Sequence, residues 1–107
     1  MTVQGWLPHL SDLDRKTVYY IQEQVATLQD TLERRDPECR QEGLFDVDVP
    51  ELGGLLGKLP TQFHQQVREL EALAHRLAHE FLPEAECVCY QREGGGRGVT
   101  YHGVGWY

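Results

Sequence analysis

The chain contains two stretches in which apolar residues recur at alternating intervals of three and four positions. The first consists of Val18, Ile21, Val25, Leu28 and Leu32. This heptad spacing is typical of a helix that packs along one narrow apolar stripe. Ser11 and Asp14 resemble a capping box, and Pro37 restricts the residue before it to non-helical backbone. We therefore predict a helix over about 11–35.

The second stretch is stronger and consists of Phe63, Val67, Leu70, Ala74, Leu77 and Phe81. Pro60 or Thr61 suits a helix start and Pro83 follows the end, so we predict a helix over about 60–82. The two helices have similar lengths and can pack side by side as an antiparallel pair. Leu73 and Ala78 widen the apolar face of the second helix, which predicts a further layer against it.

The connector 36–59 is longer than the roughly two to eight residues of a simple helix connection. Within this irregular segment, apolar residues from Leu44 to Val49 interleave with Asp46 and Asp48, and Pro50 and three glycines follow. We interpret the pattern as an extended segment followed by a short helical turn.

Two β-rich runs, 87–92 and 99–102, flank a glycine-rich segment near the C-terminus. They predict a β-hairpin over about 86–107, and hence an α+β fold in which the helix pair packs with this hairpin. If Arg92 opposes Val99, then Tyr90 faces Tyr101 and Cys89 faces His102. The N-terminal residues around Trp6 either add a third strand or cap the core.

The composition narrows the class of protein. A length of 107 residues predicts a single domain over 1–107, and no apolar run is long enough for a membrane span. Ten Lys and Arg against 17 Asp and Glu give a net charge of −7, which disfavours nucleic-acid binding. The odd number of cysteines and an N-terminus without a secretory pattern lead us to expect reduced thiols in the cytoplasm.

Cysteines and histidines suggest one metal site. His75 and His79 have the i, i+4 spacing of a helical ligand pair, and Cys87, Cys89 and His102 are brought together by the predicted register. Such a set has the ligand types of a zinc site, although one residue between the cysteines is tighter than usual. The alternative is that no cofactor binds, with a solvated polar helix flank and two small buried thiols.

An acidic run, Asp46 to Glu51, also deserves comparison with calcium loops. It does not match the EF-hand pattern, because Pro50 and Glu51 occupy the fifth and sixth positions. We interpret it as a solvated acidic rim, with an irregular calcium site as the open alternative.

Aromatic residues concentrate near the C-terminus, where Trp and Tyr anchor either interfaces or cores. The candidate partner-binding residues are Tyr90, Tyr101, Trp106 and Tyr107. No motif for nucleophilic catalysis is present in the sequence. We therefore expect a small acidic adaptor or regulatory protein that acts through protein contacts and forms a homodimer through its helices. The alternatives are a metal-binding or metal-sensing protein and, ranked last, a small thiol- or histidine-dependent enzyme.

Overall fold

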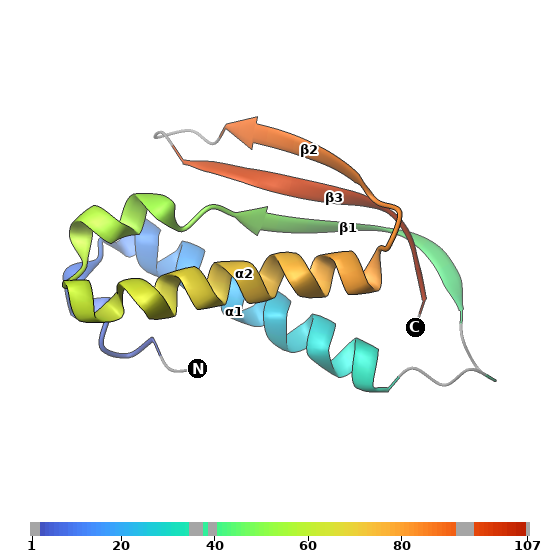
Figure 1. The fold of residues 1–107 in the computed structure, drawn as a ribbon, viewed down its shortest axis with the longest axis horizontal. Coiled ribbons are helices and arrows are strands. Elements are labelled where there is room, and N and C mark those ends of the chain that lie inside the picture. Colours follow the sequence, from blue (N-terminus) through green and yellow to red (C-terminus); the bar gives the residue numbers. More distant parts are fainter. Residues whose placement is uncertain (1–2, 35–37, 39–40, 92–95, 107) are drawn as a thin grey trace.

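The computed structural model describes residues 3–34, 38, 41–91 and 96–106. Two long helices, α1 (Asp12–Glu33) and α2 (His64–Phe81), lie on one side of a sheet of β1 (Glu42–Pro50), β2 (Glu86–Gln91) and β3 (Arg97–Trp106) (Figure 1). Short 3-10 helices precede α1 and α2, with bounds η1 (Leu7–His9), η2 (Gly53–Lys58) and η3 (Thr61–Phe63). The predicted α+β arrangement of a helix pair and a C-terminal hairpin is confirmed.

The start of α1 follows from the predicted cap. The Ser11 hydroxyl accepts a hydrogen bond from the Asp14 amide at 3.3 Å, and Lys58 Nζ lies 2.6 Å from Asp14 Oδ2. Burial of Asp14 raises its pKa, but the hydrogen bonds from Lys58 and Ser11 and the charge of Lys58 outweigh burial and lower the pKa below its ordinary value. This ion pair joins the first turn of α1 to η2.

Helix α2 begins at His64, four residues later than the predicted start at Pro60. The Phe63 amide donates to the Pro60 carbonyl at 3.0 Å, which closes a 3-10 turn ahead of the helix. Since no side chain caps the N-terminus of α2, the tighter turn satisfies backbone groups there.

The sheet is antiparallel with strand order β1-β3-β2. Its N-terminal strand is β1, which comes from the extended segment of the connector, and η2 is the short helical turn predicted after it. The segment around Trp6 is not the third strand: it forms a turn and η1. Trp6 is fully buried and its indole Nε1 donates to Gln66 Oε1 at 3.2 Å, so this segment caps the core.

The predicted hairpin register is wrong. Val99 pairs with Cys89 rather than with Arg92, a shift of three residues, and Tyr90 therefore pairs with Gly98 and Cys87 with Tyr101. Arg92 itself lies outside the described residues. Because side chains alternate between the two faces of a strand, a shift by an odd number moves every β2 side chain to the opposite face from the one predicted.

The two faces of the sheet have different surroundings. The inner face carries Val47, Val49 and Tyr101, which are buried against the helices. Phe45, on the same face, packs on Phe81 of α2 with ring centroids 5.0 Å apart. The opposite side chains form what we call the outer face, which none of the helices in the described part of the chain covers (Figure 1). Strand β2 projects beyond the helices, and all of its residues except Tyr90 are exposed.

The apolar stripes of both helices are buried within the chain. Val18, Ile21, Val25 and Leu28 of α1 and Val67, Leu70, Ala74, Leu77 and Phe81 of α2 are among the core residues. The sheet is thus the further layer that Leu73 and Ala78 predicted, and it accounts for the stripe that motivated a homodimer. Self-association through the helices stays a prediction, which light scattering at micromolar concentration tests.

Across residues 3–34, 38, 41–91 and 96–106, neither of the long helices is apolar enough over a sufficient length to cross a membrane.

Candidate functional site

A cluster of polar rings lies between α2 and the inner face of the sheet. Tyr101 is buried, and its hydroxyl lies 2.6 Å from His75 Nδ1. The rings of His75 and His79 meet the Tyr101 ring edge-on, with centroids 5.8 and 4.8 Å away. Burial, followed by the neighbouring thiols of Cys87 and Cys89, raises the pKa of Tyr101. The phenol therefore stays protonated and joins the strand to the helix as a structural hydrogen-bond partner.

The predicted zinc ligands are only partly brought together. Cys87 and Cys89 are exposed free thiols on the inner-face side of β2, next to Tyr101. His102 points from the outer face, where its Nδ1 hydrogen-bonds to Asp46 Oδ1. In the part of the chain that the structure describes, no three His, Cys, Asp or Glu side chains are grouped so that they could hold a metal ion. The observed register therefore corrects the predicted ligand set: His102 lies on the opposite face of the sheet from Cys87 and Cys89.

The four aromatic residues predicted to bind a partner do not lie together on one surface. Tyr101 belongs to the core and is not available to a partner, as the alternative interpretation of the C-terminal aromatics anticipated. Tyr90 and Trp106 are half-buried on the outer face. The Tyr90 hydroxyl donates a hydrogen bond to Asp48 of β1, across the intervening β3. Tyr107 lies outside the described residues.

The outer face combines exposed apolar side chains with carboxylates. Leu44 is 70% exposed and lies directly opposite Val104, which is 41% exposed, while Val88 on β2 is 57% exposed. Glu42 opposes Trp106, and the row Asp46, His102, Glu86 crosses all three strands. Since side chains directly opposite each other have Cβ atoms about 5 Å apart, these residues form a continuous surface.

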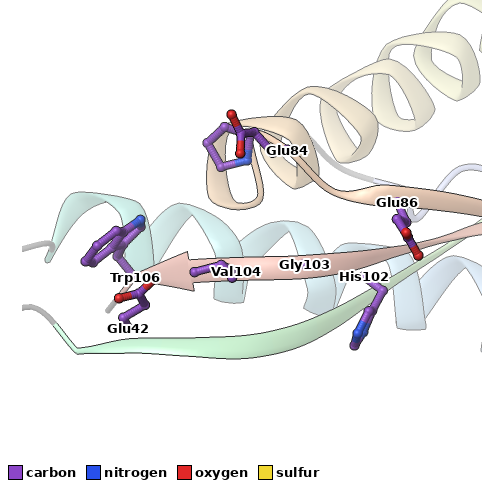
Figure 2. Close-up of a pocket in the computed structure, with 8 residues that line it drawn as sticks. Glu42, Glu84, Glu86, His102, Gly103, Val104 and Trp106 are labelled. Carbon is purple, nitrogen blue, oxygen red and sulfur yellow. The ribbon is translucent and has the colours of Figure 1, made fainter.

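A pocket of about 640 Å³ opens at one end of this surface. It forms because β2 pairs with β3 only as far as Glu86 and His102, whereas β3 continues to Trp106 beside β1. Figure 2 shows the surroundings of the pocket: Glu84 lies in the turn after α2 on one side of β3, and Trp106 lies at the end of β3 next to Glu42 of β1. The lining includes Glu42, Pro83, Glu84, Glu86, Val104 and Trp106.

The electrostatics of the outer face have one sign. Glu42, Asp46 and Glu86 are exposed, and Glu84 is exposed at the pocket rim. Among the strand residues that the structure describes, the one Lys or Arg is Arg97, whose place in the alternation of β3 is on the inner-face side. The net charge of −7 is thus expressed locally as a negative sheet surface around apolar side chains.

The sequence interpretation missed Leu44, Val88 and Val104 as surface residues. Leu44 and Val104 occupy strand positions that alternate with buried residues such as Val47 and Tyr101, but their assignment to one face needed the pairing of β1 with β3. Val88 lies on β2, whose residues give no alternation with buried positions. No known protein family, curated protein or solved structure matches this chain. The function has to be inferred from the chemistry of the outer face and its pocket.

Proposed function

We propose that this protein is a small non-enzymatic adaptor or regulatory protein that binds another protein through the outer face of its sheet. One observation carries the proposal: Leu44 and Val104 form an exposed apolar pair on a face that neither of the described long helices covers, next to a pocket lined by Trp106. Exposed apolar residues bordered by polar ones are the usual composition of a protein-binding site.

The half-buried Trp106 supports this assignment further. Tryptophan side chains contribute a large share of the binding energy at interfaces because they bury much area with few rotatable bonds. Trp106 is half-buried and lines the pocket. A partner side chain that fills the pocket would complete the burial of the indole.

A reducing location is part of the proposal. Cys87 and Cys89 are exposed free thiols, and residues two apart on a strand are too far apart to form a disulfide with each other without backbone movement. Exposed thiols of this kind persist in a reducing compartment, and the cytoplasm is the one we propose.

The test is partner capture with a matched pair of surface variants. Leu44 on the outer face and Leu13 on α1 are similarly exposed, at 70% and 62%, so Leu44→Ser and Leu13→Ser remove the same side chain from two different surfaces. Proteins cross-linked from a lysate of the source organism are identified by mass spectrometry. A genuine partner is then purified, and its affinity is measured by calorimetry.

We expect Leu44→Ser to weaken the purified partner's affinity by about tenfold or more and Leu13→Ser to leave it unchanged, with similar unfolding curves for both. Equal affinity for wild type and Leu44→Ser, or a loss confined to Leu13→Ser, would remove the outer face from the proposal.

A further inference from the structure

We propose that the outer face selects a basic protein segment, whose Lys or Arg side chain enters the pocket between Glu84, Glu86 and Trp106. This inference rests on the proposed function and specifies the chemistry of the partner. It is argued from three features: the charge of the face, the composition of the pocket and the position of the apolar residues.

The charge of the face determines which partner can be desolvated there. A partner with acidic side chains would bring like charges together with Glu42, Glu84 and Glu86, which is costly, whereas a basic segment would meet complementary charge at each of these positions. A second copy of this chain would present the same carboxylates to the pocket. The outer face is therefore unsuited to self-pairing and suited to a cationic partner.

The pocket has the composition that accommodates a long basic side chain. Lys and Arg combine an apolar stem with a charged end, and the pocket combines Val104 and Pro83 with carboxylates at its rim. Trp106 adds an aromatic wall, and a cation close to a tryptophan face gains a further attraction. The stem would contact the apolar wall while the charged end meets Glu84 or Glu86.

The apolar residues beside the pocket set the spacing of the partner. Leu44 and Val104 are a directly opposed pair, one residue pair along from Gly105 and two from Glu42 and Trp106. A segment that runs along β3 would thus place an apolar side chain on Leu44 and Val104 and a basic one in the pocket. Because side chains of an extended segment alternate between its two sides, a basic and an apolar residue two positions apart point to the same side and have this arrangement.

The experiment uses the full chain and defined peptides. The probe is a short peptide in which lysine and valine lie two positions apart with serine between them, and the two matched controls replace lysine by glutamate or by serine. Binding is followed by calorimetry and by tryptophan emission. Trp6 is fully buried whereas Trp106 lines the pocket, so a change in emission that disappears in Trp106→Phe reports the pocket.

We expect the lysine peptide to bind with an affinity that falls as salt is raised, and the glutamate peptide to bind at least about tenfold more weakly. The double variant Glu84→Gln with Glu86→Gln should weaken the lysine peptide by about tenfold. The control Glu23→Gln with Glu33→Gln, on exposed positions of α1, makes the same change in net charge and should have little effect.

Three results would overturn the inference: failure of the lysine peptide to bind better than the serine peptide, equal losses in the pocket and α1 double variants, or concentration-dependent pairing of the chain through Leu44 with no peptide binding. If Leu44→Ser abolishes capture of a natural partner while the lysine peptide fails, the charge inference falls and the proposed function stands. If the peptide binds and Leu44→Ser has no effect on capture, the proposed function falls.

Discussion

Gly98 and Tyr90 form a cross-strand unit that a substitution should break in a measurable way. The two residues are paired between β3 and β2, and a Cβ placed on Gly98 would overlap the Tyr90 ring, lying 2.8 Å from Cε1 and closer still to the hydroxyl end. Gly98 does not have the positive φ that disfavours alanine. The cost of Gly98→Ala should therefore come from the tyrosine ring and not from the backbone.

The magnitude has two parts. An added methyl group in a packed contact costs about 1–3 kcal/mol in general. Displacing the ring also removes the hydrogen bond from Tyr90 to Asp48, which is partly exposed and is expected to contribute about 1 kcal/mol. We expect Gly98→Ala to lower the free energy of unfolding by about 2–4 kcal/mol, and each kcal/mol lowers the melting temperature by about 4–8 °C in a domain close to this size.

A double-mutant cycle isolates the ring. In a Tyr90→Ala background the clash is absent, so Gly98→Ala should be neutral or should stabilise the strand by up to about 1 kcal/mol, since glycine weakens strand interiors. Gly53→Ala is the matched control, because nothing lies within 4 Å of a Cβ built there. Urea unfolding followed by circular dichroism gives all of these free energies. The same cost for Gly98→Ala in both backgrounds would refute the reasoning.

Three further predictions follow from the described contacts. The lowered pKa of Asp14 means that its ion pair with the half-exposed Lys58 stabilises the fold above the unfolded pKa of about 3.9, and that this stability is lost as the pH falls through the lower folded pKa. Asp14→Asn should therefore cost at most about 1 kcal/mol near neutral pH and nothing in strong acid. Urea unfolding at a series of pH values measures both costs. Trp6→Ala should lower the free energy of unfolding by about 3–5 kcal/mol, because the indole is fully buried and donates to Gln66, while a cost below about 1 kcal/mol would show that the N-terminal segment does not cap the core. If metal analysis finds zinc, Cys89→Ser and His102→Ala should not both remove the same equivalent, because the two side chains lie on opposite faces of the sheet. Loss of that one equivalent in both variants would contradict the register.

The helices could be predicted from the sequence because their information is local. The start of α1 is specified by Ser11, the end of α2 is followed by Pro83, and the apolar stripe of each helix specifies its buried face. Each of these signals involves residues that are close together in the sequence. The register of the hairpin depends instead on the loop between β2 and β3, and the glycine-rich sequence there is compatible with several loop lengths. The resulting register error of three residues placed the β2 side chains on the wrong face of the sheet. Cys87 and Cys89 therefore do not share a face with His102, although the predicted metal site required this.

The pairing of β1 with β3 could not be predicted from the sequence, for a different reason. It joins residues such as Glu42 and Trp106, which are far apart along the chain, and alternation of side chains indicates a strand without indicating its neighbour. The outer face exists only once β1 is placed beside β3. Leu44 and Val104 therefore became candidate contacts only once the sheet was known, whereas Trp106 was selected from its residue type alone, and its role in binding stays a prediction.

We propose that the acidic side chains of the outer face have two effects that an experiment can separate. An uncovered three-stranded sheet with exposed Leu44, Val88 and Val104 is prone to pair with another copy, and like charges on the same face oppose such pairing. The same charges favour a basic partner. Glu84→Gln with Glu86→Gln should therefore increase concentration-dependent association in sedimentation experiments while weakening binding of the lysine peptide. A variant that loses peptide binding without any gain in association would show that the carboxylates act in recognition alone.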